Sequence, residues 1–136
     1  MIASNTEIMN PFHILNIDDD VFMCQILRNL FEIHGFLVSD AYSTEQALNI
    51  LNSRKIDFIV LNILTDSNSG FSLLKILRHI SNTPAIVISP NDDDKFRLYC
   101  LELGAIDYLK KPVNFDELIH IVKHTLKIVS GNSSLF

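Results

Sequence analysis

Five short apolar runs alternate with five stretches of helical spacing, and this alternation limits the chain to very few folds. The runs cover residues 12–17, 36–41, 58–61, 85–89 and 106–109. The run at 58–61 (FIVL) is apolar at every position, which is typical of a central strand covered on both faces. Short apolar strands that alternate with helices form a parallel sheet with right-handed crossovers. The pattern therefore predicts an α/β fold, a doubly wound five-stranded parallel sheet with helices on both faces.

The stretches between the runs carry signals for where helices begin and end. Gly35 and Gly104 follow apolar stripes in residues 20–34 and 93–103, as glycine does at helix ends. Residues 43–46 (STEQ) have the form of a capping box, and Asn114 caps a last helix. The remaining stripe covers residues 73–80. With 136 residues, we expect one domain at 12–129, an N-terminal arm at 1–11 and a tail or linker start at 130–136.

Composition and charge exclude several classes of function. The formal net charge is −5 and no segment gathers lysine and arginine, which argues against nucleic-acid binding by this domain. No apolar run approaches the roughly 18 residues that a membrane span needs, and the N-terminus lacks the features of a secretory signal. Cys24 and Cys100 have no metal-ligand spacing, so we expect reduced, packed thiols and a cytoplasmic location.

Polar residues follow the apolar runs where strands of a parallel sheet would end. Asp18, Asp19 and Asp20 follow the first run, Asn62 the third and Ser89 ends the fourth, while Lys111 comes shortly after the fifth. These carboxyl ends meet at one edge, where such sheets place their sites. Paired carboxylates suit Mg²⁺, and a lysine with a hydroxyl suits a phosphoryl group. The nucleophile is missing, because an amide, unlike a carboxylate, cannot form an acyl phosphate.

Four segments carry a resemblance to a known family: ILNIDDD at 14–20, DFIVLNIL at 57–64, TPAIVIS at 83–89 and LELGAIDYLKKP at 101–112. With them the chain resembles the receiver domain of two-component response regulators over about residues 12–129. The resemblance implies a flavodoxin-like fold with strand order 2-1-3-4-5. It also implies a signalling module and not an enzyme, with a histidine kinase, a phosphotransfer protein or an output domain as partner.

The resemblance assigns roles to individual residues. Asp18 and Asp19 would form the acidic pair that holds Mg²⁺, with the backbone carbonyl of Leu64 as a further ligand. Asn62 falls at the position of the phosphate-accepting aspartate. Ser89 matches the switch hydroxyl, Tyr108 the switch aromatic residue, and Lys111 the lysine that reaches the phosphoryl group. Lys111-Pro112 would be a cis peptide bond.

Two departures from the family pattern alter the expected function. Asn62 removes the nucleophile and one charge facing the metal, so the Mg²⁺ site should be weak. Pro90 stands where the backbone N–H of a small residue would bind a phosphoryl oxygen, and proline has no N–H. We therefore expect a pseudo-receiver that is not phosphorylated at Asn62 and acts by protein contact.

Two alternatives stay open at this point. The first is a conventional Mg²⁺-dependent phospho-accepting receiver in which Asn replaces Asp at position 62. The second is an enzyme or carrier on the same fold, such as a small phosphatase or a flavin-binding protein. The lack of a glycine-rich phosphate loop disfavours the second.

The expected partner face lies on the fourth helix, fifth strand and fifth helix. Phe96, Arg97 and Tyr99, with Tyr108, offer aromatic and arginine side chains of the kind that anchor interfaces. Partial packing on the helix surface explains the same residues equally well, while Leu98, Cys100 and Leu101 are expected to face the sheet. His120 and His124 have the spacing of a metal-binding pair, but the sequence presents no third ligand. The sequence leaves the oligomeric state open.

Overall fold

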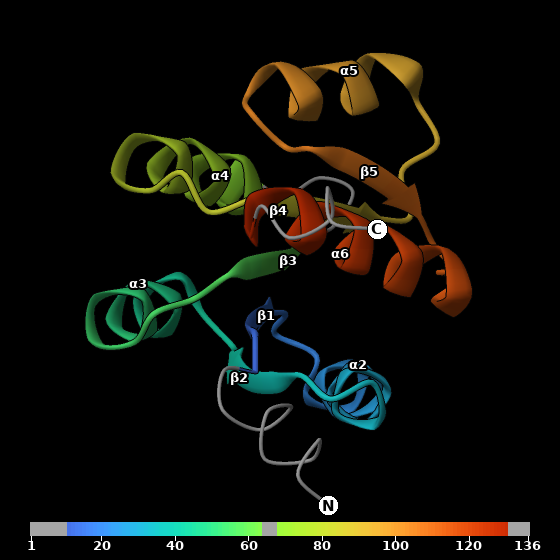
Figure 1. Ribbon diagram of the computed structural model, residues 1–136. Coiled ribbons are helices and arrows are strands. Elements are labelled where there is room, and N and C mark those ends of the chain that lie inside the picture. Colours follow the sequence, from blue (N-terminus) through green and yellow to red (C-terminus); the bar gives the residue numbers. More distant parts are fainter. Residues whose placement is uncertain (1–10, 64–67, 131–136) are drawn as a thin grey trace, which may run out of the picture.

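The computed structural model describes residues 11–63 and 68–130, and it contains one five-stranded sheet (Figure 1). All strand pairs are parallel and the strand order is β2-β1-β3-β4-β5. The strands are β1 (His13–Ile17), β2 (Leu37–Ala41), β3 (Phe58–Asn62), β4 (Ala85–Ser89) and β5 (Asp107–Lys110). The predicted doubly wound topology is confirmed, and β3 lies at its centre.

Within the described residues, four helices connect these strands and a fifth follows β5, and capping side chains fix where several of them begin. They are α2 (Val21–Ile33), α3 (Thr44–Ser53), α4 (Asn68–Ile80), α5 (Asp94–Glu102) and α6 (Phe115–Ser130). Asp20 caps α2 by accepting bonds from the backbone N–H groups of Phe22 and Met23. The predicted capping box forms in part: Ser43 Oγ accepts from Gln46 N at 3.2 Å, but Gln46 Oε1 accepts from the backbone N–H of Tyr42, at 2.7 Å, and not from that of Ser43. Asn114 Oδ1 accepts from Glu117 N at 2.9 Å and so caps α6.

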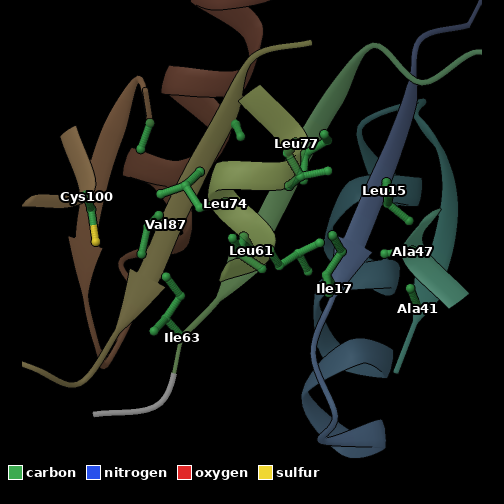
Figure 2. Close-up of a cluster of buried hydrophobic side chains, with 14 of the residues drawn as sticks. Leu15, Ile17, Ala41, Ala47, Leu61, Ile63, Leu74, Leu77, Val87 and Cys100 are labelled. Carbon is green, nitrogen blue, oxygen red and sulfur yellow. The ribbon is translucent and has the colours of Figure 1, made fainter. Parts of the chain in front are cut away.

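The helices divide between the two faces of the sheet and build two separate cores. On one face, α3, α4 and α5 pack over the sheet around Leu61, Leu74 and Val87 (Figure 2). On the other face, α2 and α6 pack around Phe31, Phe58 and Val122. Because β3 and β4 contribute side chains to both cores, they are apolar at successive positions, as the sequence pattern predicted.

The register of the strands brings their carboxyl ends together at one edge. Ile17 pairs with Leu61, Asn62 with Ile88, and Ser89 with Lys110. The segments that follow β1, β3, β4 and β5 therefore leave the sheet beside one another. This register collects the polar residues of the candidate site.

The structure corrects some details of the sequence prediction. Strand β5 begins at Asp107 and leaves out Ile106, which is 42% exposed. Ile80 ends the apolar stripe of α4 but is 54% exposed, because the helix ends there beyond the sheet. The helix α6 extends through Ser130, where a tail was expected. The expected arm, up to residue 10, and the tail from residue 131 lie outside the described residues. Within the described ranges, no helix has the length and apolar character needed to cross a membrane.

Candidate functional site

Asp18 is the buried carboxylate of the site. It directly follows β1 and is 5% exposed. Its Oδ1 accepts a hydrogen bond from Asp20 N at 3.0 Å, while its Oδ2 is buried and has no hydrogen-bond partner. Burial raises the pKa of Asp18, and the bond from Asp20 and the charge of Lys111 oppose this rise only in part. The site thus holds an acidic oxygen that lacks a donor or cation.

Asn62 lies beside it, at the end of β3. Its Nδ2 donates to the backbone oxygen of Ile17 at 3.4 Å, so the side chain crosses from β3 to the end of β1. Its Oδ1 is buried and unpartnered. Buried polar atoms normally find partners, and here two acceptor oxygens, one on Asp18 and one on Asn62, have none. This unmet acceptor capacity fits a small hard cation that prefers oxygen ligands.

The other two predicted metal ligands are Asp19 and the backbone carbonyl of Leu64. Asp19 is exposed beside Asp18, while Leu64 lies outside the described residues. Among the described residues no group of three or more His, Cys, Asp or Glu side chains gathers in a way that could hold a metal ion. The site therefore offers two carboxylates and one amide where an aspartate at position 62 would give three carboxylates.

Ser89 and Tyr108 are both engaged with the loop between β4 and α5. Ser89 is fully buried and its Oγ accepts from Asn91 N at 3.2 Å. The hydroxyl of Tyr108 donates to Asn91 O at 2.6 Å, and burial raises the pKa of this side chain. The backbone of Asn91 thus ties together the predicted switch hydroxyl and the predicted switch aromatic residue. No pattern in the sequence indicated this role for Asn91.

Lys111 follows β5, and its backbone is held at the site. Lys111 N donates to Ser89 O at 2.9 Å, and the bond to Pro112 is cis, as expected. In the described part of the chain the ammonium group forms no ion pair with Asp18 or Asp19, although its charge acts on Asp18. The neighbouring Lys110 instead pairs with Asp92 at 3.2 Å. Pro90 is exposed at the start of the loop.

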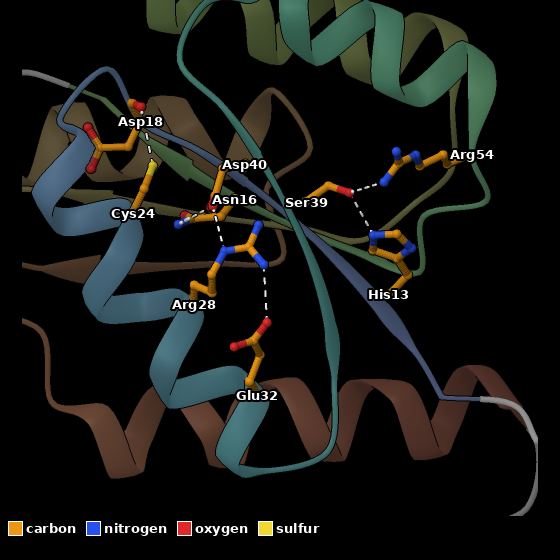
Figure 3. A network of polar contacts seen from close by, with 9 residues as sticks. All are labelled: His13, Asn16, Asp18, Cys24, Arg28, Glu32, Ser39, Asp40 and Arg54. Atoms are coloured by element: carbon orange, nitrogen blue, oxygen red, sulfur yellow. Dashed lines mark hydrogen bonds and ion pairs between the residues drawn. The ribbon is translucent and has the colours of Figure 1, made fainter. Parts of the chain in front are cut away.

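A polar network that sequence reasoning missed extends from the site along β1 and β2 (Figure 3). Asn16 is fully buried, and its Nδ2 lies 3.4 Å from Asp40 Oδ1. Arg28 of α2 binds Asp40 through Nε at 2.9 Å and Glu32 through Nη1 at 3.1 Å. The signal in the sequence was Asn16 itself, a polar residue inside the apolar run between Ile14 and Ile17.

Cys24 closes the site from the side of α2. Its Sγ donates to the backbone oxygen of Asp18 at 3.4 Å, and burial raises its pKa to about 12. Burial likewise raises the pKa of Cys100 to about 11. Both thiols are free and buried, as expected, and a raised pKa disfavours the reactive thiolate.

The predicted partner face divides into packed and exposed residues. The ring of Phe96 packs against Phe71, with ring centroids 4.8 Å apart, and against Tyr108 at 5.8 Å. Tyr99 also contacts Phe71, at 4.9 Å, but remains 40% exposed. Arg97 is exposed and lines a small hollow of about 210 Å³ together with Tyr108 and Lys110.

Leu98 corrects the prediction that it faces the sheet. It is 54% exposed, because the phase of α5 turns Cys100 toward the core. Arg97, Leu98 and Tyr99 are therefore among the exposed side chains of α5 that are open to a partner, while Phe96 packs against the core.

Comparison with known proteins places this geometry in a family. The family model described as the response regulator receiver domain matches residues 14–123. The chain therefore belongs to the receiver domains of two-component response regulators. It is 38% identical to the transcriptional regulatory protein CpxR of Escherichia coli K12, over 84% of this chain and 49% of that protein. The chain thus spans about half the length of the curated relatives it matches.

Solved structures agree with this assignment. A Francisella response regulator receiver domain is 36% identical with a TM-score of 0.80, covering 88% of this chain and 99% of that chain. A response regulator from Clostridium difficile is 34% identical with a TM-score of 0.80, covering 85% of this chain and 96% of that chain. Receiver domains are generally signalling modules that interact with histidine kinases and output domains, and in general they are not enzymes.

Proposed function

We propose that this receiver domain signals through protein contacts and is not phosphorylated at position 62. The observation that carries the proposal is the side chain of Asn62. Acyl phosphate formation needs a carboxylate nucleophile, and the neutral amide oxygen of Asn62 does not provide one. The amide is also held by its Nδ2 contact with Ile17 O. The side chain of Asn62 therefore links the ends of β3 and β1 but cannot accept a phosphoryl group.

The loop after β4 supports the same proposal. Without a phosphoryl group the Ser89 hydroxyl still anchors this loop, because its oxygen accepts a bond from Asn91 N. Pro90 offers no N–H to a phosphoryl oxygen. The hydroxyl of Tyr108 is already bound to Asn91 O. These contacts hold the loop in one arrangement without a phosphoryl group, so a partner that prefers this arrangement would supply the differential free energy that signalling needs.

Magnesium fits the site only as a weakly held ion. Asp18 Oδ2 and Asn62 Oδ1, both unpartnered, are the buried oxygens that would bind it, with Asp19 and the Leu64 carbonyl as the further ligands of the family pattern. When bound, Mg²⁺ would supply positive charge for an incoming phosphoryl group. The loss of one carboxylate at position 62 lowers the affinity for the ion.

The central experiment measures intact mass after incubation with Mg²⁺ and acetyl phosphate. It compares this chain with Asn62→Asp and with Asn62→Asp/Pro90→Ala. We expect no phosphate-sized gain for this chain or for Asn62→Asp, and a gain for the double variant, which regains both the nucleophile and the N–H donor.

The outcomes separate the proposal from its alternatives. A gain that appears already in the single variant Asn62→Asp, with Pro90 still in place, supports a conventional receiver in which Asn replaces Asp. A gain on the unaltered chain contradicts the proposal and points to another acceptor residue.

A magnesium titration tests the metal site separately. We expect weak binding by this chain and tighter binding by Asn62→Asp, because the added carboxylate faces the ion. Equal affinities in the two proteins would contradict the proposed place of Asn62 in the site.

A further inference from the structure

Two imidazole rings stack on the outer surface of α6. His120 and His124 are both exposed and lie one helical turn apart. Their ring centroids are 6.1 Å apart and the ring planes differ by 14°. Leu118, Ile119 and Val122 are buried in the core beneath the helix. This packing fixes the rotation of α6 and keeps both rings on the solvent side.

The spacing of the two histidines suits a transition-metal ion once the stacked rings turn about their side-chain bonds, so that one nitrogen of each ring faces a shared ion. Neutral imidazole nitrogen is a preferred ligand of zinc, copper and nickel, and two histidines at positions i and i+4 of a helix are a known ligand spacing for zinc. In the described part of the chain neither ring forms a hydrogen bond, so binding an ion would cost no existing polar contact. The two rings sit on a helix of 16 residues anchored to the core, so the backbone is already ordered before an ion arrives.

We propose that His120 and His124 form a bidentate site for a divalent transition-metal ion of the zinc, nickel and copper group. Within the described residues no third His, Cys, Asp or Glu completes the site. Water or a ligand from outside the chain fills the remaining positions, and the adjacent exposed charge of Lys123 weakens binding. The site is chemically distinct from the oxygen site around Asp18, because soft or borderline ions prefer nitrogen and Mg²⁺ prefers oxygen.

Calorimetric titration with Zn²⁺ in the presence of excess Mg²⁺ tests this proposal, because Mg²⁺ occupies the oxygen ligands and leaves the imidazoles free. We expect one zinc ion per chain. His120→Ala and His124→Ala should each weaken binding by about tenfold or more, since each removes one arm of a two-point attachment.

His34 and His79 supply the matched control. Both are exposed single histidines, so the double variant His34→Ala/His79→Ala removes two imidazoles, one more than either test variant, without touching the pair. We expect unchanged zinc affinity in this control, and nuclear magnetic resonance line broadening by Cu²⁺ confined to amides near 120 and 124. Absence of zinc binding, zinc affinity in either single variant equal to that of the unaltered chain, or loss of binding in the control would each overturn the proposal.

Discussion

Asp18 shows how one residue serves the site at the expense of the fold. Burial raises its pKa, and neither the Asp20 backbone bond nor Lys111 compensates fully. The native state therefore holds a proton on this carboxyl at higher pH than the unfolded chain does. Its favourable contribution is complete below the unfolded pKa of about 3.8 and is lost as pH rises through the raised folded pKa. Above that folded pKa the ionised side chain destabilises the protein.

Asp18→Asn should therefore stabilise the protein at neutral pH. The amide keeps an oxygen to accept from Asp20 N and carries no charge to bury. We expect Tm at pH 7.5, without Mg²⁺, to rise by a few degrees, and the gain to shrink as the pH falls toward 4. Thermal unfolding followed by circular dichroism measures both.

Asp19→Asn is the matched control, because Asp19 is adjacent but exposed. We expect its Tm to stay close to that of the unaltered chain. A Tm of Asp18→Asn below that of the control would show that the carboxylate is stabilising, contrary to this account.

At the scale of elements, the junction between α5 and β5 depends on a close approach to α4. Gly104 has φ of +110°, and a Cβ placed there would lie 2.4 Å from Cδ of Arg78. Arg78 is held in place because its Nη2 donates to Thr83 O. Gly35, by contrast, has φ of +88° and open space around it. Substituting alanine at Gly35 would therefore introduce backbone strain only, whereas alanine at Gly104 would introduce backbone strain and steric overlap with Arg78.

Gly35→Ala should cost about 1–2 kcal/mol, because only the left-handed backbone is strained. Gly104→Ala should cost more, about 3 kcal/mol, because Arg78 must also move out of its place. Urea unfolding measures both free energies. Equal losses of unfolding free energy in the two variants would mean that Arg78 moves away from residue 104 at no measurable cost.

The amino end of the sheet contains a second polar cluster, around the start of β1. His13 Nε2 lies 2.7 Å from Ser39 Oγ, which also accepts from Arg54 Nη1 at 3.1 Å (Figure 3). Burial lowers the pKa of His13, and the charge of Arg54 lowers it further, against the opposite effect of Asp57. The unfolded chain therefore binds a proton here at higher pH than the folded chain. This contribution to stability is present above pH 6.5 and falls as the pH falls below it.

His13→Gln should flatten the pH dependence of stability between about pH 5 and 7. Urea midpoints measured across that range give the slope for each protein. His79→Gln changes an exposed histidine and should leave the slope as it is. If both variants have the slope of the unaltered chain, His13 does not titrate differently in the folded state.

At the scale of the whole molecule, α5 joins the core to a surface that is open to a partner. Phe96 packs on Phe71 and Tyr108 beneath the helix, while Arg97 and Leu98 point outward. The aromatic contacts continue to Tyr108 and, through Asn91, to the loop beside Ser89. A continuous chain of contacts thus links α5 to the loop beside the site.

The unfolding free energies of Phe96→Ala and Arg97→Ala should distinguish a side chain that packs against the core from one that is exposed on the surface. Removing the partly buried ring should cost about 2–3 kcal/mol of unfolding free energy, whereas removing the exposed arginine should change it by less than about 0.5 kcal/mol. Urea unfolding of the two variants gives the comparison. A small cost for Phe96→Ala would show that the ring contributes little to the core and is available to a partner.

The sequence by itself determined the fold and the set of polar residues that lie at one edge of the sheet. Apolar runs, helix stripes and caps are local signals, and parallel strands bring their polar ends to one edge whatever the details. Asp18, Asn62, Ser89 and Lys111 were therefore identifiable before any coordinates. Only the tertiary structure decided which polar atoms find partners. The buried bonds of Asn16 with Asp40, the two contacts of Asn91, and the unpartnered oxygens of Asp18 and Asn62 depend on register and helix phase. Those quantities are set by the packing of distant residues, which no local pattern in the chain records.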